Sequence, residues 1–172
     1  QIGVQLGIRA IKVTGGEPFA RKGCTGFLRE LKGLPGIEKV TLTTNGILLE
    51  EALPQLVDMG LNGVNISLDT LNPQAYHQLT GRNEFHRVWH SLQKAVQGGL
   101  RVKVNCVPLR GINDGELVSI AGLAESMPVD VRFIELMPTQ CSSGFDRVAT
   151  AEVLEQLRKK WPDLTSDQTV HG

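Results

Sequence analysis

This sequence is poor in aromatic side chains and in cysteine, and it has no excess of charge of either sign. Aromatic residues make up 5% of the 172 residues, and lysine plus arginine equal aspartate plus glutamate at 18 each. The balanced charge gives no electrostatic reason to expect nucleic acid or a membrane as partner. No apolar run is long enough to span a bilayer, and the first residues resemble no secretory signal or transit peptide. With 41% apolar and 21% charged residues, the composition is that of an ordinary globular protein.

The three cysteines, Cys24, Cys106 and Cys141, are odd in number and far apart. They give no disulfide framework and suit a reducing compartment, which we expect to be the cytoplasm, or the mitochondrial matrix in a eukaryote. Their spacing is neither CxxC nor CxxxCxxC, and the histidines also lack ligand spacing. The chain is therefore expected to hold no metal itself.

The length fits one domain over residues 1–172, and it is short for a closed eight-fold α/β barrel. The sequence starts without a methionine, with what reads as the last turn of a helix, and it stops without a clear end. We expect a segment of a longer protein.

Short β-like runs alternate with helical patterns along the chain. The runs are Ala10–Thr14, Val40–Thr44, Gly63–Asp69, Arg101–Val107 and Val131–Leu136. The helical patterns lie in "GFLRELKGLPG", "LLEEALPQLVDMG" (with Leu49, Leu53, Leu56 and Val57 on its apolar face), "HRVWHSLQKAVQGG", "NDGELVSIAGLAESM" and Ala151–Lys160. This alternation predicts parallel strands joined by right-handed βα connections.

Within the runs, apolar and polar side chains alternate. Val64, Ile66 and Leu68 oppose Asn65, Ser67 and Asp69, and the other runs follow the same rule. One face of the sheet should therefore meet helices, while the other is polar. Helices outside and polar groups inside predict a complete or partial barrel whose interior holds a polar ligand.

The turn "TGGEP" follows the first run, at an edge where α/β barrels place their chemistry. Its glycines would let a ligand approach the backbone. Pro18 removes a backbone donor, however, and Glu17 would repel a phosphate. The turn also matches neither the P-loop nor the dinucleotide-binding pattern. A cation such as an ammonium group fits it better, and a plain tight turn is the alternative.

Five stretches occur in order and carry a resemblance to a known family. They are "GIRAIKVTGGEPFARKG", "TLTTNGILL", "VNISLDTL", "LRVKVNCVPLRGIND" and "VRFIELMP". From about Leu6 to Asp163 they resemble the GTP 3′,8-cyclases of molybdenum-cofactor biosynthesis, which are radical S-adenosylmethionine (SAM) enzymes. "TGGEP" alone indicates radical SAM, and the last two stretches narrow the resemblance to the cyclases. It implies an α/β fold, a partial parallel (β/α)6 TIM-like barrel, with about strands two to six in this chain.

The resemblance also implies a SAM site. The turn of Gly15, Gly16 and Glu17 would hold the methionyl ammonium group, while Ser67 and Met137 would contact the rest of the cofactor. Without the resemblance, Met137 could equally be a core residue after a strand.

For GTP, the resemblance implies contacts from Lys12, Thr43, Lys103 and Arg132. Lys12 stands where the family has arginine, so it lacks the two-pronged hydrogen bonding of a guanidinium. Lys103 would face the interior, where an unpaired ammonium costs several kcal/mol, and a bound anion would explain its presence. A structural, salt-bridged arginine is the alternative for Arg132.

The family uses [4Fe–4S] clusters to cleave SAM to the 5′-deoxyadenosyl radical, which starts the conversion of GTP to 3′,8-cyclo-GTP. The cysteines of this chain match neither cluster motif, so we expect the ligands outside it and no SAM cleavage by these residues alone. The resemblance further implies cyclic pyranopterin monophosphate synthase as the recipient of the product, and a homodimer as one possible assembly.

Three other functions stay open. A peptide-modifying or sulfatase-maturing radical SAM enzyme would share "GGEP" without needing cations for a triphosphate. A non-catalytic SAM- or nucleotide-binding module would need only the polar face. A cluster-free phosphate-binding barrel enzyme would need an acid/base pair, for which Glu17, Asp69 and Glu135 have suitable side chains.

Overall fold

The computed structural model describes residues 2–137 and 144–167. Five strands form one parallel sheet in the order β1-β2-β3-β4-β5, which is also their order along the chain. They are β1 (Ala10–Val13), β2 (Lys39–Thr44), β3 (Gly63–Ser67), β4 (Val102–Cys106) and β5 (Val129–Phe133).

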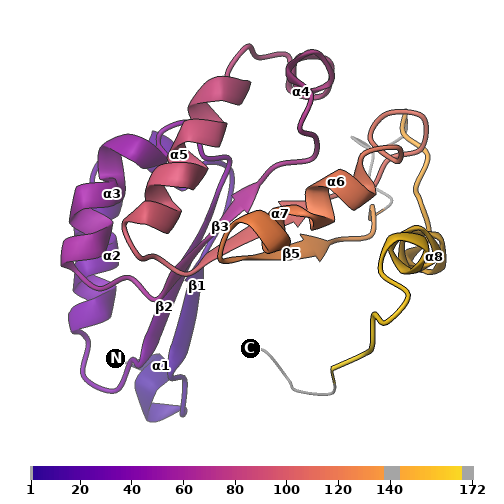
Figure 1. The fold of residues 1–172 in the computed structure, drawn as a ribbon. Coiled ribbons are helices and arrows are strands. Elements are labelled where there is room, and N and C mark those ends of the chain that lie inside the picture. Colours follow the sequence, from indigo (N-terminus) through magenta and orange to yellow (C-terminus); the bar gives the residue numbers. More distant parts are fainter. Residues whose placement is uncertain (1, 138–143, 168–172) are drawn as a thin grey trace.

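The helices run between the strands. They are α1 (Ile2–Gln5), the 3₁₀ turn η1 (Pro18–Ala20), α2 (Cys24–Gly33), α3 (Leu49–Asp58), α4 (Pro73–Thr80), α5 (Phe85–Gln97), α6 (Leu117–Ala121), α7 (Leu123–Ser126) and α8 (Thr150–Lys160). Figure 1 shows α2, α3 and α5 stacked along one face of the sheet, and no described helix covers the face opposite them. Sequential strand order with the helices on one side is the product of successive βα units of one hand, as in a barrel wall. The predicted α/β class and partial barrel are confirmed.

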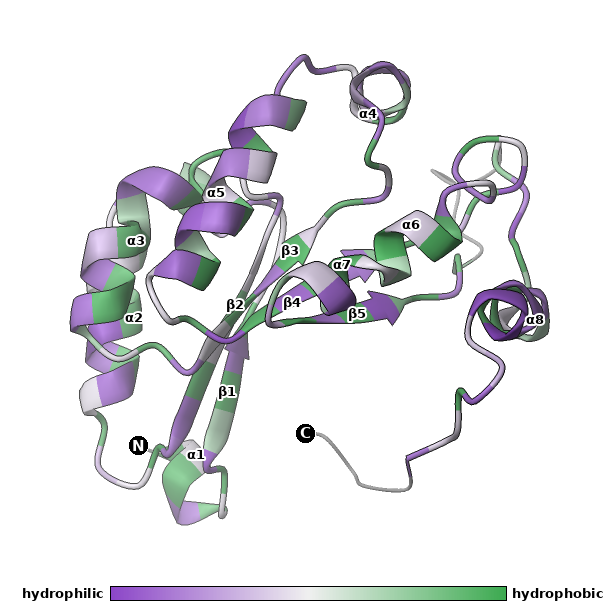
Figure 2. Ribbon diagram, viewed as in Figure 1, coloured by the Kyte–Doolittle hydropathy of each residue, from purple (hydrophilic) through white to green (hydrophobic). Residues whose placement is uncertain are grey.

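The alternation of side chains sets the two faces of the sheet. Val40 and Leu42 of β2 are fully buried against the helices, whereas Thr41 and Thr43, which alternate with them, are partly exposed. Figure 2 shows the same alternation of apolar and polar residues along the strands. β3 differs, because it lies at the centre of the sheet and is buried on both faces, so that Asn65 is only 5% exposed.

Several predicted boundaries are wrong. Helix α4 was not predicted, although Asn72 caps it by accepting from the N–H groups of Gln74 and Ala75. The single helix predicted in "NDGELVSIAGLAESM" is two short helices that meet at Gly122. The fifth strand begins at Val129 and ends at Phe133, two and three residues earlier than predicted. Val57 of α3, predicted on the apolar face, is 43% exposed.

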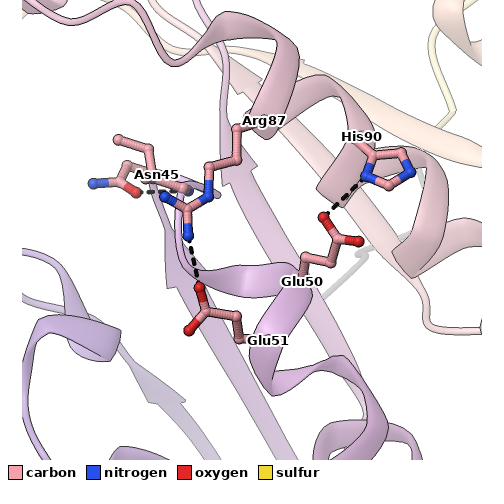
Figure 3. Close-up of polar contacts among 6 residues, drawn as sticks. Asn45, Glu50, Glu51, Arg87 and His90 are labelled. Carbon is pink, nitrogen blue, oxygen red and sulfur yellow. Dashed lines mark hydrogen bonds and ion pairs between the residues drawn. The ribbon is translucent and has the colours of Figure 1, made fainter.

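Ion pairs join α3, which follows β2, to α5, which precedes β4 (Figure 3). Arg87 of α5 donates to Glu51 of α3 at 2.6 Å, and His90 lies 2.9 Å from Glu50. His77 and His86 are exposed. The charged contacts of α3 and α5 therefore lie on the outer side of the molecule, and the inner face of the sheet is left to other polar residues.

Within the described part of the chain, no helix has the length and apolarity needed to cross a membrane.

Candidate functional site

The turn after β1 exposes bare backbone. Gly15 has φ +145°, a conformation that side-chain-bearing residues rarely adopt. A Cβ added at Gly15 or Gly16 would meet no atom within 4 Å, so packing does not demand glycine at either position. The turn lines a hollow of about 410 Å³, with Arg21 and Lys22 on its rim. The space above Gly16 is thus open to a ligand.

The carboxylate of Glu17 is tied into the protein. It accepts hydrogen bonds from Thr44 Oγ1 at 2.7 Å, from the Asn45 N–H at 2.7 Å and from the Phe19 N–H at 3.1 Å. A carboxylate offers about four acceptor positions, so one stays available for a cation. Glu17 therefore joins the glycine turn to the end of β2, a role that the sequence did not predict.

The other two residues predicted to bind SAM, Ser67 and Met137, lie at the same edge of the sheet as the glycine turn but outside its hollow. Ser67 ends β3 and is exposed. Met137, 73% exposed, follows β5 and lines a second hollow of about 390 Å³ with Asp69, Leu136 and Phe145. Among the described residues, no single cavity brings together the glycine turn, Ser67 and Met137. Their shared feature is the carboxyl edge of the sheet, where α/β barrels bind ligands.

The carboxyl group of Asp69 lines this second hollow, and its pKa is shifted by burial. Desolvation raises the pKa of its carboxyl, and the hydrogen bond from the Val107 N–H to Oδ1, at 2.7 Å, opposes that rise. Glu135, the other acidic residue in this hollow, pairs with Arg147 at 3.1 Å. Of the three candidate carboxylates for a cluster-free acid/base enzyme, Asp69 and Glu135 line this hollow, whereas Glu17 lines the other.

A cationic cavity lies on the polar face, in the half nearer the amino ends of the strands. It has a volume of about 160 Å³, and the described residues that line it include no acidic side chain. The five cations of its lining come from all the strands except β3: Lys12, Lys39, Lys103, Arg132 and, immediately before β4, Arg101. Three of the four residues predicted to bind GTP are thereby brought together. A wall with this charge is suited to a polyanion.

Lys103 is the most deeply placed cation for which an ion pair is seen. Its side chain is 13% exposed, and its Nζ lies 3.2 Å from Oδ2 of Asp130, which also lies 3.6 Å from Nη2 of Arg101. No ion pair among the described residues includes Lys12 or Arg132. The alternative of a salt-bridged structural Arg132 therefore finds no support in the described part of the chain.

Thr43, the fourth predicted GTP contact, does not line this cavity. Its hydroxyl accepts from Nδ2 of Asn65 at 3.1 Å, and Asn65 does line it. Asn105, between Ser67 and Arg132 in the strand register, has a buried Oδ1 that accepts no hydrogen bond from the described residues. Both asparagines could have been identified from the sequence, since they alternate with the apolar positions of their strands.

The two cysteines within the described residues, Cys24 and Cys106, do not form an iron–sulfur ligand set. Cys24 and Cys106 are both buried and free, and burial is the main reason why the pKa of each thiol is raised. Cys141 lies outside the described residues. No group of three or more His, Cys, Asp or Glu side chains within residues 2–137 and 144–167 could hold a metal ion. The described residues thus offer an open glycine turn and a cationic cavity, but they do not supply ligands for a cluster.

Comparison with known proteins decides the family. The model of the radical SAM superfamily matches residues 1–124. This chain is a radical SAM protein.

Relatives of this radical SAM chain include molybdenum cofactor biosynthesis protein 1 of Mus musculus, which is 44% identical over 164 residues. The GTP 3′,8-cyclase of Desulforamulus reducens is 41% identical over 171 residues. These matches cover 94% and 97% of this chain, but only 26% of the mouse protein and 53% of the bacterial one. The chain thus spans about a quarter to a half of the length of these relatives.

Solved structures support the fold of the radical SAM chain. A radical SAM methyltransferase from Sphaerobacter thermophilus superposes with a TM-score of 0.72 at 20% identity, over 92% of this chain and 50% of that one. SuiB of Streptococcus suis bound to S-adenosylmethionine gives 0.66 at 20% identity, over 90% of this chain and 36% of that one. At this identity the likeness concerns the fold alone.

Proposed function

We propose that this chain forms the SAM- and GTP-binding sheet of a GTP 3′,8-cyclase of molybdenum-cofactor biosynthesis. The observation that carries the proposal is the cationic cavity on the polar face, which lies on the same sheet as the exposed glycine turn. The cyclase names of the relatives that match nearly the whole chain agree with it.

SAM is assigned to the carboxyl edge of the sheet, at Gly15, Gly16, Glu17, Ser67 and Met137. The open backbone at Gly16 and the remaining acceptor position of Glu17 suit an ammonium group, and the exposed Ser67 hydroxyl is available for a polar contact. When bound, SAM supplies the radical chemistry of such an enzyme. The residues of the chain bind and orient it.

GTP is assigned to the same face, with its phosphates toward the amino ends of the strands. A cavity of about 160 Å³ is smaller than the ~300–1,000 Å³ typical of a whole-ligand site, so it suits the phosphate end alone. Lys12, Lys103 and Arg132 would bind the phosphates, and Thr43 would contact the nucleotide directly or through Asn65. The sugar and base would then extend toward SAM, as a reaction between the two ligands requires.

The [4Fe–4S] clusters of the family would be held by residues other than the described ones. Cyclic pyranopterin monophosphate synthase as recipient of the product, a homodimer and a cytoplasmic or mitochondrial-matrix location complete the proposal. The family relationship alone supports these last points.

Calorimetric titration of GTP and of SAM into the protein at its full natural length tests the proposal. We expect Lys103→Met and Arg132→Met each to weaken GTP binding about tenfold or more, because each removes a charge-assisted contact, with SAM binding unchanged. Gly16→Ala should weaken SAM binding and leave GTP binding unchanged. The added methyl group meets no protein atom, but it narrows the space that SAM would occupy. Lys94→Met, at an exposed position of α5 on the helical side, is the matched control for Lys103→Met.

Undiminished GTP binding in both cation variants would refute the assignment of GTP to this cavity. SAM binding without any GTP binding would instead indicate a radical SAM enzyme with another substrate.

A further inference from the structure

One acidic residue lies beside the cationic cavity. Asp130 is the register partner of Lys103 in the neighbouring strand, so both side chains project from the same face of the sheet. Its Oδ2 reaches Lys103 Nζ at 3.2 Å and Arg101 Nη2 at 3.6 Å. A single carboxylate thus lies between two of the five cations.

The two partners of the Lys103–Asp130 pair differ in exposure. The Lys103 side chain is 13% exposed, whereas that of Asp130 is 50% exposed. An ammonium so deeply placed requires an anion nearby, because removing it from water is costly. The half-exposed carboxylate can be rehydrated at little cost, so it is the partner that can leave.

We propose that Asp130 is a counter-anion that a phosphate group of the substrate replaces. The inference rests on the proposed function and adds two residues to it. In the ligand-free protein Asp130 neutralises Lys103 and Arg101. When a polyphosphate enters the cavity, its oxygens bind Lys103 and Arg101 in place of Asp130. The Asp130 carboxylate then moves away from them and becomes solvated.

This exchange predicts how the site selects its ligand. A phosphate must compete with Asp130 for Lys103, and once bound it also feels the repulsion of the nearby carboxylate. A highly charged polyphosphate overcomes both costs by engaging several of the cations that line the cavity. A monophosphate meets the same two costs but engages fewer of these cations, so it should bind more weakly than a nucleoside triphosphate.

The test uses Asp130→Asn in the protein at its full natural length, titrated with GTP, inorganic tripolyphosphate and guanosine. Removing the competing charge should tighten binding of GTP and tripolyphosphate about threefold to tenfold and leave guanosine unchanged. Asp130→Glu, which restores the charge, should bind GTP as the parent protein does. Asp58→Asn is the matched control, because Asp58 pairs with Arg29 at 2.9 Å on the helical side and its loss changes net charge equally.

Unchanged or weaker binding of GTP by Asp130→Asn would overturn the inference, since Asp130 would then only orient Lys103. The proposed function would survive that result if Lys103→Met still weakened GTP binding. If Lys103→Met also had no effect, the proposed function would fail as well. A thermal unfolding curve of Asp130→Asn that matches the parent protein shows that any change in affinity is local.

Discussion

At the turn after β1, the carboxylate of Glu17 accepts hydrogen bonds from Thr44 and Asn45, which lie 27 and 28 positions away in the sequence. Thr44 is 2% exposed, so its hydroxyl depends on protein partners rather than on water. The glutamate of the "GGE" turn therefore has a structural role whether or not a ligand is bound. These hydrogen bonds also fix the position of the turn relative to the end of β2. An ammonium group bound at the turn would be positioned by the same contacts.

Glu17→Ala should destabilise the folded chain by about 2–4 kcal/mol, because it leaves the Thr44 hydroxyl and two backbone N–H groups without their acceptor. Glu17→Gln should cost less, since one amide oxygen can still accept. Urea unfolding followed by circular dichroism measures both. Glu38→Gln serves as the control, because Glu38 is 76% exposed and pairs with Arg9 only at 4.0 Å. Equal unfolding midpoints for Glu17→Ala and the parent protein would show that the three hydrogen bonds do not contribute to stability.

At the scale of elements, one buried asparagine joins the loops that follow β3 and β4. Asn113 is fully buried. Its Oδ1 accepts from the Leu109 N–H at 2.7 Å, and its Nδ2 donates to the carbonyls of Asp69 at 2.6 Å and of Val107 at 2.9 Å. These three backbone partners belong to the two connections that form the wall of the Asp69–Met137 hollow. The "GIND" stretch thus shapes the carboxyl edge without contacting the open space itself.

We expect Asn113→Ala to lower the free energy of unfolding by about 2–4 kcal/mol, because three buried backbone groups lose their partner together. Chemical denaturation gives this value. Asn72→Ala is a control of the same residue type, since it removes only the cap of α4, which is worth ~1 kcal/mol. If Asn113→Ala cost no more than the cap variant, Asn113 would not connect the two loops.

At the scale of the whole molecule, the sheet has two outer strands, and exposed apolar side chains precede one of them, β1. In the described part of the chain β1 pairs with β2 alone, so its other side presents unpaired backbone groups. Three large apolar side chains precede it in exposed positions: Ile2 at 73%, Leu6 at 78% and Ile8 at 47%. An open edge beside exposed apolar groups is a surface on which another strand can add.

The 172-residue chain studied alone should therefore self-associate as its concentration rises, as measured by sedimentation velocity. The triple variant Ile2→Glu, Leu6→Glu and Ile8→Glu should associate less, because the new charges lie beside the edge of the sheet and no core contacts are removed. Leu164→Glu, at an exposed site away from β1, should not. A monomer at all concentrations would show that this edge is protected as it stands.

The sequence by itself determined most of the strand and helix pattern, the two faces of the sheet and the position of the exposed glycine turn. Each of these depends on local periodicity or on the conformational demands of a few adjacent residues, such as the glycines of "TGGEP". Where the local signal was weak, the prediction was wrong: α4 was missed, and the helix predicted around Gly122 is divided.

Only the tertiary structure decided which polar groups meet. The pairing of Lys103 with Asp130 follows from the register between β4 and β5, and the hydrogen bonds of Glu17 follow from the position of β2 beside β1. No pattern within one strand encodes the register with its neighbour, because that register depends on how the connecting helices pack against the shared core. The polar residues of the inner face were therefore visible in the sequence, whereas their partners were visible only in the folded sheet.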